Sequence, residues 1–354
     1  MPLKIHNKPM VNMMNLSIST IKIVVIGISS VLIGLTGCSS NQNKETESAA
    51  ELKKIADAIN TDFLKIRDEA KQLALYVQQL YTPEKRNKAL QRANPSKYRL
   101  SEKGILYKPV DDGYSAVFVS GHIPVDNSIK EIVYFTEPLD QKFKEIIQQY
   151  PEVAQVYYND KNSYNRIYPF FDVLTQYEPK MNIPDFNFYY LADAQYNPKK
   201  EAVWVDEPYV DPAGRGWMVS AIAPVYLNDA LEGVPGLDVT VSTITNRYIA
   251  KTRHPYVILD ANGIVVAMNE SLTGILSLPK LEDHTYLKTI KEDTYRTENF
   301  NLLKSKSKII RQAITRIYNK GEKKIMIQKD NVRITILAEE IPELNWRLLL
   351  VLKN

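Results

Sequence analysis

Few side chains in this sequence are arranged for catalysis. Asp206, Asp211 and Asp238 could take part in acid-base chemistry, but no nucleophile accompanies them. The Gly-x-Ser-x-Gly pattern of serine hydrolases and the glycine-rich phosphate-binding loop are both absent. The four histidines are too widely spaced to suggest a metal site: His6, His122, His254 and His284. We therefore expect no enzyme, no metal and no cofactor.

The single cysteine, Cys38, lies where an export signal would end. The first 22 residues contain three lysines and no acid, and an apolar run follows over residues 23–35. This run is short for a membrane span and has the flanks of a signal peptide. Leu35, Gly37 and Cys38 resemble the lipobox of bacterial lipoproteins, which implies cleavage before Cys38 and acylation of its thiol. Met1, Met13 and Met14 all remain possible start residues.

The composition of the predicted mature chain limits its partners. Removing residues 1–37 leaves 317 residues (354 − 37), with 42 basic residues (45 − 3) and 41 acidic ones. A net charge near +1 gives no reason to expect a nucleic-acid partner. Without a second cysteine no disulfide forms within the chain, so the fold must depend on a hydrophobic core. The length suggests two domains.

A long helix is predicted after a polar tether. Apolar residues recur at intervals of three and four from Leu52 to Leu80, which produces one apolar stripe on a helix. Pro83 predicts a break. The stripe could be a coiled-coil seam between two subunits or a spine for this chain's own domains, and we favour the spine.

The rest of the chain has an α+β pattern. Strands are expected at 115–120, 131–135, 154–158, 217–223 and 236–241, with helices at 139–150 and 243–252. Residues 159–201 read as a long structured loop with a short helix. A β-hairpin over 256–267 with an Asn-Gly turn begins a second module. A helix near 309–317 and strands at 324–328, 332–339 and 345–352 complete it.

Residues 204–241 carry a resemblance to a known family. The segments 204–211, 216–220, 224–226 and 233–239 resemble, in order and spacing, the late strands of a membrane-distal module of double Cache sensor domains. These are tandem PAS-like modules found outside the membrane in bacterial chemoreceptors and sensor kinases. The resemblance implies a long spine helix followed by two modules with central antiparallel sheets. The expected divisions are a signal peptide (1–37), a tether (38–46), the spine (47–95), a ligand-binding distal module (96–250) and a proximal module (251–354).

The resemblance also implies where a ligand binds. In amino-acid-sensing members, a tyrosine in a Pro-Tyr-x-Asp segment and an aspartate in a Gly-Val-x-Gly-x-Asp segment hold the ligand's ammonium. Tyr209 and Asp238 match these positions, and Asp211 closes the first segment. A carboxylate that binds an ammonium forms a strong charge-assisted hydrogen bond. The first module is therefore expected to hold the main site, and the second to lack it.

The opposite end of the ligand is less defined. Amino-acid sensors of this family bind the α-carboxylate through an Arg-x-Trp segment, and the nearest equivalents here begin at Asn187 or, less favourably, at Arg166. If Asn187 replaces the arginine, the ligand is expected to be an amine; if Arg166 reaches the site from its loop, an amino acid is possible. Tyr189 and Tyr190 are candidate wall residues in both cases.

The predicted function is a lipid-anchored binding or sensing protein of the cell envelope, outside the cytoplasm, with an outer-membrane location possible. Family members usually continue into a second transmembrane helix and an output domain, whereas this chain ends at Asn354. Signalling would therefore need a membrane partner. The alternative is a solute-binding lipoprotein that delivers its ligand to a transporter. A third interpretation is a structural Cache protein that has lost its ligand.

Overall fold

The computed structural model describes residues 32–278 and 297–353. The chain consists of two units, residues 1–48 and 49–354. The described part of the first unit, residues 32–48, is helical. It belongs to helix α1 (Leu32–Leu80), so the helix begins before residue 47, and residues 39–46 are helical where the sequence predicted a tether. No proline or glycine interrupts residues 38–80. The predicted signal peptide lies mostly outside the described residues, as does the side chain of Cys38.

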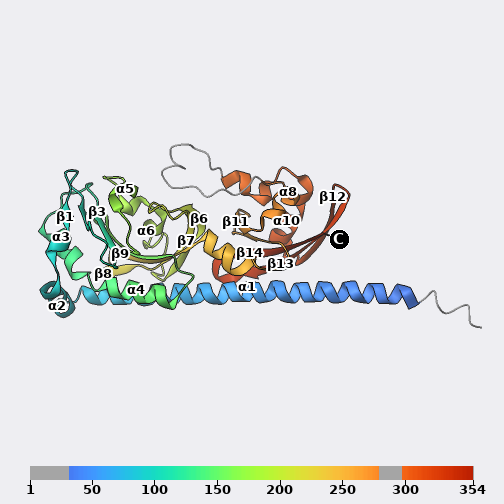
Figure 1. The fold of residues 1–354 in the computed structure, drawn as a ribbon, viewed down its shortest axis with the longest axis horizontal. Coiled ribbons are helices and arrows are strands. Elements are labelled where there is room, and N and C mark those ends of the chain that lie inside the picture. The colour runs from blue at the N-terminus through green and yellow to red at the C-terminus, as the bar shows by residue number, and fades with distance from the viewer. Residues whose placement is uncertain (1–31, 279–296, 354) are drawn as a thin grey trace, which may run out of the picture. The chain divides into compact units, whose positions relative to one another are not determined.

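The apolar stripe of α1 is buried by the chain's own sheets. Leu52, Ile59, Phe63, Ile66 and Leu73 are almost fully buried. They share one core with strands of both sheets, and Figure 1 shows α1 running alongside the two sheets. This is the spine arrangement that the sequence favoured. The helix ends at Leu80, and helix α2 (Pro83–Arg92) begins with the predicted proline at its first position.

The first sheet has nine strands, in the order β1-β2-β3-β5-β4-β9-β7-β6 with β8 paired to β9, and all of its pairings are antiparallel. Its strands are β1 (Arg99–Leu100), β2 (Leu106–Tyr107), β3 (Ala116–Val119), β4 (Gln155–Asp160), β5 (Tyr164–Tyr168), β6 (Val203–Val210), β7 (Trp217–Ile222), β8 (Val225–Leu227) and β9 (Ala230–Thr240).

Both faces of this sheet are covered, which explains why its central strands are buried along almost their whole length. One face packs on α1, α3 (Asn127–Phe135) and α4 (Leu139–Gln149). The other face carries a separate apolar cluster. The segment after β5, which contains α5 (Val173–Gln176) and α6 (Asn187–Tyr190), lies over this second face (Figure 1).

Two predicted elements of this module are wrong. Residues 131–135 belong to helix α3, because Asp126 caps it by accepting a hydrogen bond from the Ile129 amide at 3.0 Å. Residues 159–201, predicted as a loop with one short helix, contain strand β5. The other predicted strands are present, and the predicted 243–252 helix begins at α7 (Val241–Ile244) and continues as a π-helical turn over Thr245–Ile249.

The second sheet has five antiparallel strands in the order β11-β10-β14-β13-β12. The predicted hairpin is formed by β10 (Tyr256–Leu259) and β11 (Val265–Met268), and its turn is held by Asp260, whose carboxylate accepts from the Asn262 and Ile264 amides. Helices α8 (Thr273–Leu276) and α10 (Lys308–Lys320) precede the last three strands: β12 (Lys324–Lys329), β13 (Val332–Ile341) and β14 (Trp346–Lys353).

A junction connects the two sheets through α1. The Phe63 ring lies 4.9 Å from the Trp204 ring of β6 and 6.0 Å from the Trp346 ring of β14. Glu343, which precedes β14, accepts hydrogen bonds from Trp204 Nε1 at 3.1 Å and pairs with Arg67 Nε at 3.2 Å. The chain is thus α+β, with a long spine helix and two antiparallel sheets, as predicted.

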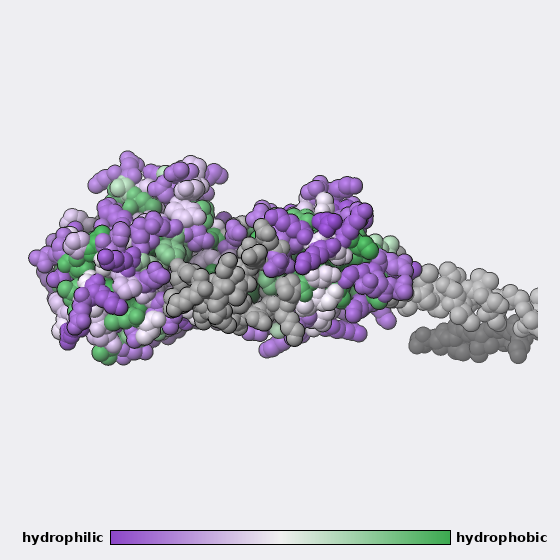
Figure 2. Space-filling view, turned by 90° about the horizontal axis from the view of Figure 1, so that it is seen from above, coloured by the Kyte–Doolittle hydropathy of each residue, from purple (hydrophilic) through white to green (hydrophobic). Residues whose placement is uncertain are grey.

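The surface and the helices of the described residues have two further features. The face in Figure 2 is mostly hydrophilic, with apolar residues in separate patches. Within residues 32–278 and 297–353, none of the helices combines the length and the apolar character of a membrane span.

Candidate functional site

Three central strands of the first sheet bring polar side chains together around Asp238. Gln155 of β4 and Ser220 of β7 are the direct cross-strand neighbours of Asp238 in β9. Directly opposed residues of antiparallel strands point to the same face. Gln155 Nε2 donates to Asp238 Oδ2 at 2.6 Å, and Ser220 Oγ donates to Oδ1. The carboxyl group is therefore fixed on both of its oxygens.

Tyr209 and Asp211 complete this group from the end of β6. The pairing of β6 with β7 is interrupted between Val205 and Tyr209, where Pro208 has no amide hydrogen to donate. After this irregularity the Tyr209 hydroxyl lies 2.6 Å from Ser220 Oγ. Asp211 begins the turn to β7 and accepts hydrogen bonds from the Ala213 and Arg215 amides at 2.9 and 3.1 Å.

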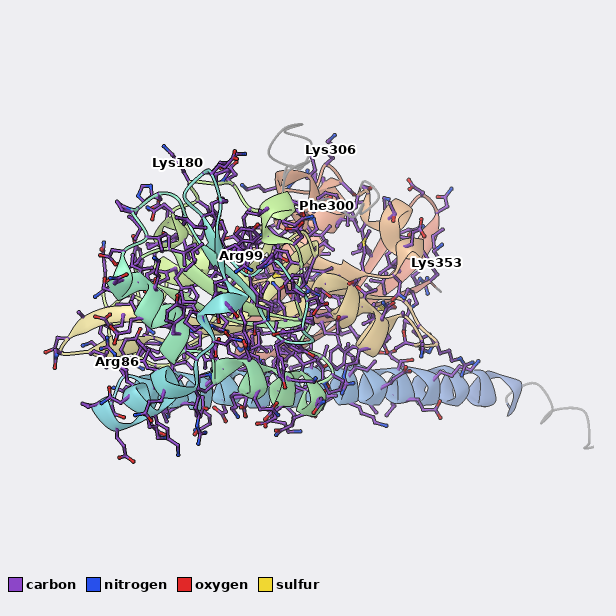
Figure 3. The ribbon with its side chains drawn as sticks, turned by 60° about the vertical axis from the view of Figure 1, so that its left-hand side comes forward. Arg86, Arg99, Lys180, Phe300, Lys306 and Lys353 are labelled. Atoms are coloured by element: carbon purple, nitrogen blue, oxygen red, sulfur yellow. The ribbon has the colours of Figure 1, made fainter. Side chains whose placement is uncertain are left out.

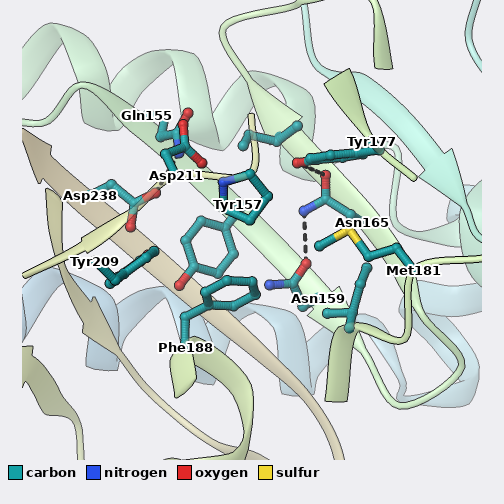
Figure 4. Close-up of a pocket in the computed structure, with 13 residues that line it drawn as sticks. Gln155, Tyr157, Asn159, Asn165, Tyr177, Met181, Phe188, Tyr209, Asp211 and Asp238 are labelled. Carbon is teal, nitrogen blue, oxygen red and sulfur yellow. Dashed lines mark hydrogen bonds between the residues drawn. The ribbon is translucent and has the colours of Figure 1, made fainter. Parts of the chain in front are cut away.

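A small cavity lies beside these groups on the face opposite α1 (Figure 4). Its volume is about 20 Å³. The walls combine carboxyl, amide and aromatic side chains, and none of the lining residues is basic. They are Gln155, Tyr157, Asn159, Asn165, Ile167, Tyr177, Met181, Ile183, Phe188, Tyr209, Asp211, Pro212 and Asp238.

Aromatic rings form one wall of this cavity. Phe188 of α6 lies 6.0 Å from the Tyr157 ring and 5.6 Å from the Tyr209 ring. Gly236 makes room for Tyr157, because a Cβ atom at Gly236 would lie 2.3 Å from the tyrosine's Oη. Electron-rich ring faces beside carboxylates favour a cation.

An amide relay forms the opposite wall. Asn165 Nδ2 donates to Asn159 Oδ1 at 2.7 Å, and the Tyr177 hydroxyl donates to Asn165 Oδ1 at 3.3 Å (Figure 4). Within the described part of the chain, Gln155 Oε1 accepts no hydrogen bond although it is buried. An acceptor in this position suits a ligand that donates hydrogen bonds.

Burial changes the protonation of the two acids. It raises the pKa of Asp238 to about 8, and the nearby Asp211 charge adds to this effect, while Ser220, Gln155 and Arg215 oppose it. Burial likewise raises the pKa of Asp211, although the hydrogen bonds from the Ala213 and Arg215 amides lower it. It also holds the pKa values of Tyr157, Tyr177 and Tyr209 well above the ordinary range, so these phenols remain neutral donors. Two carboxyl groups without a lining cation favour a positively charged ligand.

Three of the predicted ligand residues, Tyr209, Asp211 and Asp238, meet at this cavity. The other predicted residues do not line it. Asn187 begins α6, with its side-chain oxygen 2.9 Å from the Phe188 amide. Tyr189, which belongs to α6, is buried in the apolar cluster on this face of the sheet. Tyr190 is exposed and contacts the Tyr196 ring.

The expectation that Arg166 could reach the site from a loop is wrong. Arg166 belongs to β5, and residues alternate between the two faces of a strand. Asn165 and Ile167 line the cavity, so Arg166 points to the opposite face. There it is fully buried, pairing with Asp140 at 2.6 Å and donating to the Val133 carbonyl at 2.8 Å. It serves the packing of α3 and α4 on the sheet.

Sequence reasoning missed Gln155, Tyr157 and Asn159, which share the cavity face of β4, as well as Ser220. A period-two reading of residues 155–159 would have placed the first three on one face. Arg215 was missed as well: its Nη2 donates to the Pro169 carbonyl at 3.1 Å and its charge acts on both acids.

Comparisons with known proteins identify the fold. No family model matches this chain, and no curated protein matches it either. Among solved structures, the extracellular domain of the candidate histidine kinase soHK1S-Z6 matches with a TM-score of 0.51 at 12% identity, over 90% of this chain and 97% of that one. The corresponding domain of mmHK1S-Z3 matches with a TM-score of 0.50 at 12% identity, over 88% and 94%.

A third match is the sensory domain of the Campylobacter jejuni chemoreceptor Tlp3 with isoleucine bound, with a TM-score of 0.48 at 12% identity, over 92% of this chain and 98% of that one. The matches with the two kinase domains establish that this chain has the fold of extracellular sensor domains. The fold that the resemblance implied, a spine helix with two antiparallel sheets, is thereby confirmed. The two antiparallel sheets on one helix differ from the two hinged α/β lobes on which the transport alternative depends.

Proposed function

We propose that this chain binds a small molecule with a protonated amine, an amine or an amino acid, in the cavity beside Asp238. The observation that carries this proposal is the pair Asp211 and Asp238, both buried, in a cavity without a lining cation. The unpartnered amide oxygen of Gln155 completes a site that can accept hydrogen bonds from an ammonium. A buried carboxylate is costly unless a positive charge accompanies it.

We further propose that the domain lies outside the cytoplasm, is anchored through lipid on Cys38, and reports its ligand to a membrane partner. The fold it shares with extracellular sensor domains of candidate histidine kinases supports the extracytoplasmic location and the sensing role. The lipobox-like residues before Cys38 support the anchor. Delivery of a ligand to a transporter remains the alternative role for the same site.

Thermal-shift screening of amines and amino acids, followed by calorimetric titration, tests the ligand class. A ligand that binds only the folded protein raises its melting temperature. Asp238→Asn keeps the shape of the side chain and removes its charge. We expect it to reduce affinity by about thirtyfold or more, as is typical for loss of a buried charge partner.

Asp229→Asn is the matched control, because this acid is 97% exposed in the turn before β9. It should leave binding unchanged. A ligand that is anionic or neutral, or an amine that binds Asp238→Asn as tightly as the unmodified chain, would refute the proposal.

A further inference from the structure

The cavity beside Asp238 is adjacent to a second and larger one. The outer cavity has a volume of about 310 Å³ and shares three wall residues with the inner one, Tyr177, Met181 and Pro212. The segment between α5 and α6 supplies most of its remaining lining. The two cavities therefore adjoin at these three residues.

The inner cavity limits the part of the ligand that contacts Asp238. Its volume is about 20 Å³, and about 10–15 Å³ on this measure holds one water molecule. An unsubstituted ammonium group is of water size, whereas a quaternary ammonium is several times larger. The geometry thus favours a primary amine whose head alone enters the inner cavity.

The walls between the two cavities disfavour an α-carboxylate. In an amino acid this group is one carbon away from the ammonium, so it would lie close to Asp211 and Asp238. Tyr177, Met181 and Pro212 offer it no cation. Arg215 uses Nη2 to hold the Pro169 carbonyl, and it is not among the residues that line either cavity, although its buried Nε has no hydrogen-bond partner within the described residues. Like charges at this range repel.

The outer cavity has acids of its own. Glu178 and Asp185 line it, both are exposed, and neither side chain forms an ion pair or a hydrogen bond within the described residues. Lys180 is the one basic residue of the lining, and Figure 3 shows it at the edge of the module. A second independent feature belongs to the inner cavity: Gln155 is 1% exposed, and its Oε1 has no hydrogen-bond donor in the described chain.

Resting on the function proposed above, we infer that the site selects a linear diamine or polyamine. One terminal primary ammonium enters the inner cavity beside Asp238 and Gln155. The methylene chain passes Tyr177 and Met181, whose ring and thioether are apolar. The second ammonium lies in the outer cavity beside Glu178 and Asp185. The ligand then places a positive charge near each pair of acids.

Calorimetric titration of the purified chain with butylamine, putrescine, cadaverine and spermidine tests this inference. All four probes have a primary ammonium. Butylamine has no second charge, putrescine and cadaverine place a second ammonium at different distances, and spermidine has three positive charges. We expect at least one of the diamines or spermidine to bind about tenfold more tightly than butylamine, which corresponds to one or two partly exposed ion pairs. Tetramethylputrescine, which keeps both charges but enlarges both heads, should bind at least about tenfold more weakly than putrescine.

The double variant Glu178→Gln, Asp185→Asn tests the outer cavity. It should reduce the advantage of the diamines over butylamine to about threefold or less while leaving butylamine affinity unchanged. Both positions are exposed, so the fold should not be affected. Asp229→Asn, an exposed acid distant in sequence, should leave the advantage intact.

The outcomes separate this inference from the proposed function. If butylamine and the diamines bind equally, or if the advantage survives in the double variant, the diamine inference is overturned and amine binding stands. Tighter Asp238-dependent binding of an α-amino acid has the same consequence. If none of these amines and no amino acid binds, the proposed function itself fails.

Discussion

Asp238 has two hydrogen-bond donors, and yet burial leaves its pKa at about 8. The donors from Gln155 and Ser220 stabilise the carboxylate, but desolvation and the neighbouring Asp211 outweigh them. In the ligand-free protein at neutral pH, the group is therefore mostly a neutral acid. An arriving ammonium shifts it to the charged form, so protonation and ligand binding are linked.

The first prediction is a proton released on binding. At pH 7, an acid with a pKa of about 8 is roughly nine-tenths protonated. Binding an ammonium selects the carboxylate, so we expect release of up to about one proton per ligand at pH 7 and an affinity that rises with pH until Asp238 is ionised in the free protein. Calorimetry in two buffers of different ionisation enthalpy measures the release. Equal heats in both buffers, with binding confirmed, would show that Asp238 is already ionised.

The second prediction concerns stability without ligand. An acid whose pKa is higher in the folded than in the unfolded chain is protonated more in the folded state, so its contribution to stability is lost as pH rises from about 4 to 8. The slope approaches 1.4 kcal/mol per pH unit for one group. Urea unfolding between about pH 5 and pH 9 should show this decline in the unmodified chain and a flatter curve in Asp238→Asn. Parallel curves would contradict the assigned protonation.

At the scale of elements, helix α1 contributes to both cores. Phe63 is fully buried between Trp204 of the first sheet and Trp346 of the second. A large ring in such a position cannot be removed without leaving a cavity that contacts both sheets.

The third prediction follows from this position. Phe63→Ala should reduce the free energy of unfolding by about 3–5 kcal/mol, the usual cost for a buried phenylalanine. Leu64→Ala is the matched control on the same helix: Leu64 is 38% exposed, and we expect a change of about 1 kcal/mol or less. Chemical denaturation measures both. If the two variants lose equal stability, α1 is not a shared core element.

The elements show why part of the fold could be predicted and part could not. The stripe from Leu52 to Leu80 and the strands of the second sheet have strong periodicity, and the structure contains them. At 131–135 the β-branched residues suggested a strand, but the Asp126 cap favours a helix. Strand β5 was missed because both of its faces are covered. Its polar and apolar residues therefore do not alternate along the sequence, and the usual strand pattern is absent.

The candidate site shows the same division. Tyr209, Asp211 and Asp238 belong to segments with a recognisable order, and they were predicted. Gln155 and Ser220 become neighbours of Asp238 only through the pairing of β4 and β7 with β9, which are distant in sequence. Arg166 was misplaced because one residue of register decides which face of a strand a side chain occupies.

For the whole molecule, attachment to a membrane is the property that the sequence suggests most strongly. The fourth prediction is that Cys38→Ala leaves the precursor uncleaved or releases the protein from membranes, because no thiol is present to accept lipid. Fractionation and migration on a gel measure this, with Ser39→Ala as the control that keeps the cysteine. Unchanged fractionation and migration of Cys38→Ala would refute lipid anchoring.

A ligand-dependent response is the fifth prediction. Tyr209 and Trp204 belong to the same strand, β6, so a change at the cavity has a direct path to Glu343 and α1. Cross-linking in native membranes, with and without the amine found by screening, should capture a partner in one state more than in the other. Glu343→Gln should weaken this difference without changing ligand affinity. Equal capture in both states would leave binding or delivery as the role.

The junction at Phe63 also has a consequence for how such proteins can diversify. A new binding specificity could be acquired by exchanging residues 96–250 for those of a relative, but the incoming module must present a surface that fits the α1 stripe and the ring of Trp346. Exchange of residues 96–250 alone would combine a foreign β6 with the resident helix. Viable chimeras should therefore take α1 and the distal module from the same parent. The crossover then lies after β9, and no second crossover falls between residues 52–80 and the distal module.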